Sequence, residues 1–290
     1  MLRPASFGRA ACGIMGPLEG ESLKSMLLRR YASIYAALWK NSVTREMTFK
    51  VNFLLWILVD LLWFSIQLCF FGVLYSHTEK IGDWTKWEVI LLAGAGNFIQ
   101  QIFVALFQTN MAHMSENVRT GRLDFLLLLP VNTRFIVSLR QPDLNAYVTG
   151  ALAVAVMVYA GMRLDLSPSP AAIAGFLLLC AAGVLIHYSM MFMISCVCFW
   201  TVRAEGIVWG YYHLLQVSRQ PDAAFSGAFR IFFTFVIPMI LVANVPAKLL
   251  AHKINSPFEM LLLLGMSGVI YLVSEAVWRF SMKRYRSASS

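Results

Sequence analysis

Charged residues are scarce in this sequence. Only 13% of its 290 residues are Asp, Glu, Lys or Arg, and 59% are hydrophobic, whereas soluble domains carry roughly 25% charged residues. A soluble chain of this length needs more polar surface than this composition supplies, but surface that faces lipid must be apolar. The composition therefore argues against an ordinary soluble domain and predicts an integral membrane protein.

Short catalytic motifs are missing as well. The sequence contains no GxxxxGK[ST] phosphate-binding loop and no HExxH, GxSxG or SxxK pattern. Its five cysteines show neither CxxC nor Cys/His metal spacing, so we expect no disulfide and no metal site. We therefore expect no catalytic residue and no cofactor in this chain.

Apolar segments are what the sequence has in abundance, and they predict an all-α fold with six transmembrane helices. The expected spans are residues 51–75, 87–109, 144–160, 171–200, 231–243 and 258–280. The fifth span contains Pro238, where we expect it to be broken. Residues 21–290 are thus expected to form one transmembrane domain.

The residues ahead of the first span divide into a tail and a helix. Residues 1–20 contain two arginines but no apolar core of a secretory signal, so we interpret them as a disordered or mis-assigned tail. In residues 21–50, apolar residues recur at helical spacing from Leu23 to Trp39, with Lys and Arg on the other side. Such a basic amphipathic helix is expected to lie in the membrane interface, although packing on a partner protein gives the same pattern.

The positive charge is unevenly distributed. The net charge is +9, and eighteen of the 24 Lys and Arg residues fall in residues 1–50, 110–143, 201–228 and the C-terminal tail. Only five fall in the loops on the other side. Loops rich in Lys and Arg face the cytoplasm, so both termini are predicted to be cytoplasmic. The net charge is thereby explained without a nucleic-acid partner.

A few polar residues interrupt the spans. Asp60 is the one carboxylate well inside a span, where an ionised Asp costs about 2.5–3.5 kcal/mol. It must face protein or water, and either a substrate contact or a bond between helices satisfies that need. The intramembrane His187 leaves a proton-relay role open. The candidates for a pathway or a subunit interface are Asp60, Gln67, Asn97, Gln100, Gln101 and Pro238.

The connection between the second and third spans carries the most specific pattern. It reads Glu116-Asn-Val-Arg-Thr-Gly-Arg-Leu-Asp-Phe-Leu-Leu-Leu-Leu-Pro-Val-Asn132. This segment resembles the R.G.LD..LLRP.N segment of the ABC type-two permeases, in a bacterial subfamily long described as of unknown function. Leu129 stands where that pattern has Arg. Downstream, residues 220–222, 235–238 and 245–250 are similar to the same subfamily's second pattern, with Gln220 in place of an aromatic residue. The resemblance covers about residues 25–285.

The resemblance implies a partnership. Two permease subunits, identical or paralogous, pair with two ATPase subunits, which bind ATP and Mg. Residues 116–132 then correspond to the coupling helix that docks on the ATPase, and the stretch 244–256 dips back into the outer leaflet. The residues implied in coupling are Glu116, Arg119, Gly121, Arg122, Asp124, Pro130 and Asn132.

We therefore expect the permease subunit of an ATP-driven efflux transporter in a bacterial inner membrane. Its pathway is expected between two permeases, along polar faces of the first, second and fifth spans, and its shortage of charge suggests a hydrophobic or amphipathic cargo. The alternatives are a proton-coupled secondary transporter using Asp60 and His187, an intramembrane enzyme and a membrane scaffold. An intramembrane enzyme needs convergent polar groups at one depth, which the sequence does not offer.

Overall fold

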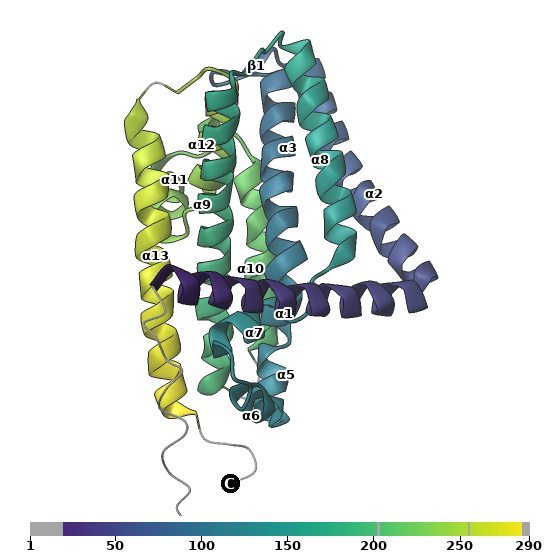
Figure 1. The fold of residues 1–290 in the computed structure, drawn as a ribbon. Coiled ribbons are helices and arrows are strands. Elements are labelled where there is room, and N and C mark those ends of the chain that lie inside the picture. The colour runs from purple at the N-terminus through teal and green to yellow at the C-terminus, as the bar shows by residue number, and fades with distance from the viewer. Residues whose placement is uncertain (1–19, 202–203, 255, 286–290) are drawn as a thin grey trace, which may run out of the picture.

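The chain folds into a bundle of long helices with a small β-hairpin at one end (Figure 1). The computed structural model describes residues 20–201, 204–254 and 256–285. The long helices are α1 (Gly20–Thr48), α2 (Lys50–His77), α3 (Lys86–Phe103), α8 (Leu144–Arg163), α9 (Pro170–Ser195), α12 (Met239–Leu250) and α13 (Pro257–Arg284). Strands β1 (Lys80–Ile81) and β2 (Trp84–Thr85) pair antiparallel and mark what we call the hairpin end.

Shorter elements complete the second, fourth and fifth crossings and the opposite end of the bundle, which we call the α6 end. Helix α3 continues through a π-helical turn, η1 (Val104–Gln108), into α4 (Thr109–Ala112) and α5 (Met114–Arg119). The other short elements are α6 (Arg122–Leu127), α7 (Thr133–Leu139), η2 (Cys196–Phe199), α10 (Glu205–Leu214), η3 (Leu215–Arg219), η4 (Asp222–Ala224), α11 (Gly227–Ile231) and η5 (Phe232–Val236).

Helix α3 forms the centre of the bundle. It packs against α2, α8, α9 and α12, and small residues such as Gly94 and Ala95 let these neighbours approach closely. Helix α2 is largely exposed, because only Phe64 and Phe71 of its side chains are buried. The apolar outer surface of α2 is therefore suited to lipid or to another membrane subunit.

Helix α1 runs across the bundle, at a large angle to the long helices (Figure 1). Tyr31, Ile34, Tyr35 and Leu38 are half-buried at i, i+3, i+4 and i+7, while the residues between them are exposed. The predicted amphipathic helix is thus present, and its apolar face packs on the chain's own bundle. The predicted tail lies almost entirely in residues 1–19, outside the described residues.

Five helices are long and apolar enough to cross a membrane, and they contain the predicted first, second, third, fourth and sixth spans. The predicted fifth span, residues 231–243, is not a straight helix. It covers parts of two helical segments, Gly227–Val236 and Met239–Leu250, which are bent by 85° at residues 237–238. The helix is therefore interrupted at Pro238 and continues at a different angle, as expected of a residue that cannot continue a helix.

Contacts at its two ends show that this bent pair is re-entrant. Ahead of it, the Trp84 indole of the hairpin donates to Asp222 Oδ1 at 2.9 Å. After it, Lys253 forms an ion pair of 2.6 Å with Glu88, beside the same hairpin. Both ends thus lie at the hairpin end, and α11 and α12 occupy the half of the bundle nearest to it (Figure 1). The dip begins earlier than the predicted 244–256.

The fifth crossing belongs instead to α10 and η3. At its start, the Ala204 backbone N–H donates to Ser115 Oγ in α5 at the α6 end, and by Asp222 the chain has reached the hairpin. The prediction that residues 201–228 form a cytoplasmic connection between the fourth and fifth spans is therefore wrong. Arg219, counted there among the cytoplasmic charges, lies inside the bundle.

Candidate functional site

The segment predicted to couple to a partner folds into a compact helical hook at the α6 end. Helices α5, α6 and α7 follow one another with short turns, and Gly121 between the first two has φ +71°. Glycine adopts this left-handed conformation without the steric cost that a side chain adds. Gly121 thus allows α6 to turn back against α5 and α7.

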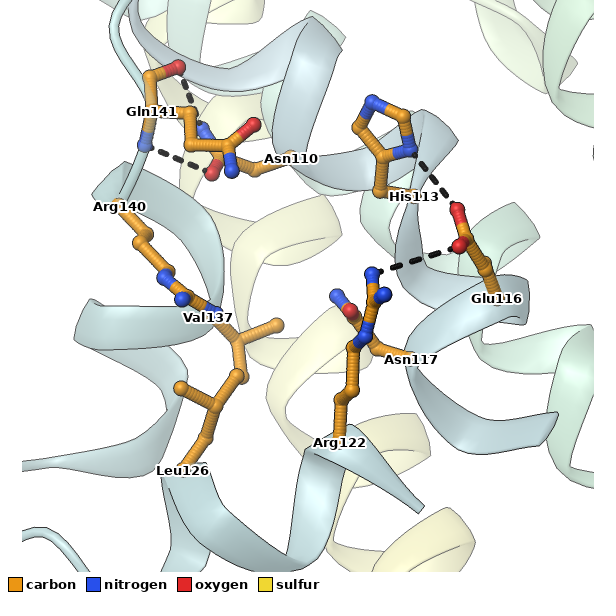
Figure 2. Close-up of a pocket in the computed structure, with 9 residues that line it drawn as sticks. All are labelled: Asn110, His113, Glu116, Asn117, Arg122, Leu126, Val137, Arg140 and Gln141. Atoms are coloured by element: carbon orange, nitrogen blue, oxygen red, sulfur yellow. Dashed lines mark hydrogen bonds and ion pairs between the residues drawn. The ribbon is translucent and has the colours of Figure 1, made fainter. Parts of the chain in front are cut away.

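Most charged residues of the hook are paired within the chain. Glu116 accepts from Arg122 at 3.3 Å and lies 3.5 Å from His113, as Figure 2 shows. Asp124 Oδ1 accepts from the Tyr285 hydroxyl at 2.8 Å, which ties α6 to the residue after α13. Burial and this bond raise the pKa of Tyr285 to about 12. These bonds hold α5, α6 and the residue after α13 together.

The end of the hook is fastened to α1. Arg30 donates to the Pro130 carbonyl at 2.9 Å, and the Asn132 N–H donates to the Tyr31 hydroxyl at 3.1 Å. The Asn132 side chain also caps α7 by accepting from the Phe135 N–H. Pro130 and Asn132 therefore position the hook against the cross-running helix.

The exposed tip of the hook is apolar. Phe125 is 72% exposed and Leu128 is 81% exposed, and Leu129 and Arg119 are also exposed. In contrast, Leu123 and Leu126 of the same run are buried. We call Phe125, Leu128 and Leu129 the apolar tip. Sequence reasoning assigned contact to the charged residues and missed this tip, although an apolar run too short to span a membrane was the available signal.

A cavity of about 200 Å³ lies inside the hook (Figure 2). Asn110 borders it and holds the loop after α7, because its amide donates to the Gln141 carbonyl and accepts from the Gln141 N–H, at 3.1 and 2.9 Å. Arg122 and Arg140 reach into the same space. The paired amide bonds fix the hook to the end of the second span.

The polar candidates within the spans separate into different places. Arg219 of η3 donates to Gln67 of α2 at 2.9 Å and to Gln100 of α3 at 2.5 Å, joining three elements. Asn97 is buried and its amide nitrogen has no partner among the described residues. Gln101 faces α8 instead, and Pro238 lies at the bend of the re-entrant pair. Nothing in the sequence flagged Arg219, because its segment was taken for a loop.

Asp60 lines a second, larger cavity of about 520 Å³, between α2, the end of the second span, α8 and α10. Four carboxylates border it, with three aromatic rings and two amides. The carboxylates are Asp60, Glu116, Asp143 and Glu205; the rings are Trp56, Trp209 and Tyr212; the amides are Gln108 and Asn145. His113 and Glu116 also border the cavity inside the hook, so the two spaces adjoin.

His187 is fully buried elsewhere in the bundle. Its Nδ1 lies 3.5 Å from the Tyr211 hydroxyl, and its ring packs on Phe103. It does not line the cavity that contains Asp60. The two groups proposed for a proton relay are therefore not joined in the described structure.

A family of known proteins matches most of the chain. The family described as ABC-2 family transporter protein matches residues 61–289, which includes the hook, the re-entrant pair and every span except the start of the first. No curated protein matches the sequence.

Proposed function

Since the chain belongs to the ABC-2 transporter family, we propose that it is the permease subunit of an ATP-driven exporter in a bacterial inner membrane. It is a multi-pass membrane component of an ABC transporter. In our proposal two ATPase subunits, which bind ATP and Mg, drive it, and a second permease, identical or paralogous, completes the pathway. The hook docks on an ATPase subunit, and both termini face the cytoplasm.

The apolar tip is the observation that carries this proposal. An exposed Phe and Leu at the α6 end cost free energy in water and gain it when a partner's groove covers them. Arg119, exposed at the end of α5, is available as part of a charged rim, as is usual around the apolar core of an interface. The internal ion pair of Glu116 and the bond from Tyr285 to Asp124 keep the tip in a fixed shape. A rigid docked element can transmit motion of the ATPase to the spans.

The test is purification of the tagged chain from gently solubilised native membranes, followed by identification of its partners. We expect a stoichiometric partner with a GxxxxGK[ST] loop. Leu128→Asp should remove that partner, because it places a charge in the apolar contact, and Arg119→Glu should weaken it. Phe258→Asp is the matched control, since Phe258 is 65% exposed at the hairpin end.

Two results would contradict the proposal in different ways. Recovery of the chain alone, under conditions that keep a known transporter intact, would favour a secondary transporter and make Asp60 the next residue to change. Equal recovery of the ATPase with Leu128→Asp and Phe258→Asp would retain the permease but remove the docking role of the hook.

A further inference from the structure

We propose that the 520 Å³ cavity beside Asp60 binds an amphipathic organic cation as the cytoplasmic entry site of the transported substrate. This inference rests on the proposed function, because a bound cation is a transported substrate only if the chain is a permease. The size of the cavity lies within the range of about 300–1,000 Å³ that accommodates drug-sized molecules.

Charge is the first argument. The chain as a whole carries +9, yet the lining of this cavity is acidic. Glu116 is already paired with Arg122 and His113, so the excess negative charge comes from Asp60, Asp143 and Glu205. Among the described residues, no Lys or Arg lines the cavity, and the Arg219 guanidinium is engaged with Gln67 and Gln100. Arg219 and Arg45, which lie outside the lining, attract Asp60 and Asp143 and balance part of this charge. The remaining carboxylate charge favours a positively charged occupant.

Aromatic rings are the second argument. Trp56, Trp209 and Tyr212 contribute their side chains to the same cavity. The face of an indole or phenol ring attracts a cation and also covers apolar surface, so the rings suit a molecule that combines both properties. A small hydrated metal ion has no use for this apolar lining.

Two amides in the wall of the cavity have an oxygen that is unpaired in the described part of the chain. Gln108 lines the cavity, the residue is only 7% exposed, and its Oε1 has no hydrogen-bond partner among the described residues. A buried acceptor of this kind costs about 1–3 kcal/mol when it is left unpaired. The Oδ1 atom of Asn145, which also lines the cavity, has no partner there either. Each of these oxygens has less than 1 Å² of accessible surface, so its side chain must rotate toward the cavity before a ligand N–H can reach it.

The position of the cavity suits an entry site. Asp60 lies about three turns after the start of α2. His113, Glu116 and Glu205 border the cavity at the α6 end, and His113 and Glu205 are exposed. A cation can therefore meet exposed carboxylate first and the intramembrane Asp60 last. Because the cavity shares His113 and Glu116 with the hook, movement of the hook alters its wall directly.

The experiment compares two probes of nearly equal shape and opposite charge. Radiolabelled tetraphenylphosphonium and tetraphenylborate are bound to the purified, immobilised full chain, and only binding that excess unlabelled probe displaces is counted. We expect displaceable binding of the cation and not of the anion. Asp60→Asn and Trp209→Leu should each weaken it about tenfold, through loss of a charge contact or a cation–π contact. Glu79→Gln, an exposed carboxylate at the hairpin end, should leave it unchanged.

The inference is overturned if the wild-type chain binds cation and anion equally, or if it shows displaceable binding of neither. This comparison uses only the wild type, so it holds even if a variant fails to fold. Unchanged binding by both cavity variants, when they elute as wild type in size exclusion, overturns it as well. The partner purification described above is run on the same preparation. An ATPase partner without cation binding removes only this inference, whereas cation binding without an ATPase partner removes the proposed function.

Discussion

Arg134 of α7 and Glu275 of α13 form an ion pair of 2.6 Å that connects the hook to the last span. The Arg134 side chain is nearly buried, and it also donates to the Tyr188 hydroxyl and to Ser274 Oγ. Its guanidinium lies 4.5 Å from the centre of the Phe192 ring. One side chain thus ties α7 to both α9 and α13, so displacement of the hook must carry these spans with it.

Replacing Arg134 should therefore destabilise the fold. Arg134→Met leaves Glu275 and two buried hydroxyls with fewer partners, and we expect a loss of about 2–4 kcal/mol. The readout is thermal unfolding in detergent, followed by reaction of the buried Cys180, Cys196 and Cys198 with a thiol-reactive dye. Arg279→Met is the control, because Arg279 bonds the same carboxylate at 2.8 Å but is 74% exposed, and its loss should cost less than about 1 kcal/mol. Equal effects of the two variants would contradict the anchoring role.

Close packing holds the re-entrant helix α12 against α9. A Cβ atom on Gly183 would lie 2.8 Å from Val242 Cγ1 and 3.3 Å from the Val242 carbonyl oxygen. Gly183→Ala should therefore displace α12 and lower stability by about 1–3 kcal/mol in the same unfolding assay. Gly210→Ala should change little, since nothing lies within 4 Å of the equivalent position. Unchanged stability of Gly183→Ala would contradict this close contact between α12 and α9.

Acid should loosen the base of the re-entrant pair. Burial alone would raise the pKa of Asp222, but hydrogen bonds from Lys248 and Trp84 more than offset it, so the pKa lies below its ordinary value. A lowered carboxyl pKa contributes stability above the unfolded value of about 3.9, and that stability is lost as the pH falls through the folded pKa. The unfolding temperature should therefore decrease when the pH is lowered below about 4. Asp222→Asn should remove part of that pH dependence. Asp165→Asn, at an exposed aspartate of the same end, should keep the wild-type slope.

The sequence predicted the long spans well and the fifth one badly, for a physical reason. Uninterrupted apolar runs such as 171–200 leave a helix no alternative to crossing the membrane. The segment of α10 and η3 is short and carries Glu205 and Arg219, so its hydropathy resembles that of a loop. The tertiary bonds from Arg219 to Gln67 and Gln100, together with the nearby Asp60, stabilise its buried charge, and these partners are remote in sequence.

The candidate site was located by resemblance, but the roles of its residues needed the structure. Asp124 looked like a contact residue until its bond with Tyr285, 161 positions away, became apparent. The sequence did not single out Phe125 and Leu128, because a helical run of apolar residues does not say which face is covered. The acidic cavity was likewise invisible, since Asp60, Asp143 and Glu205 come from three distant segments.

The central claim is that the apolar tip contacts an ATPase subunit on the cytoplasmic side of the membrane, and a photo-cross-linker at the tip tests it most directly. p-Benzoylphenylalanine replaces Phe125 in cells that express the full chain, with replacement of Phe258 as the control. Our account predicts an ultraviolet-dependent adduct from position 125 alone, whose second component carries a GxxxxGK[ST] loop. An adduct at position 125 with lipid or with proteins that lack this loop, while the complex remains intact, would contradict it.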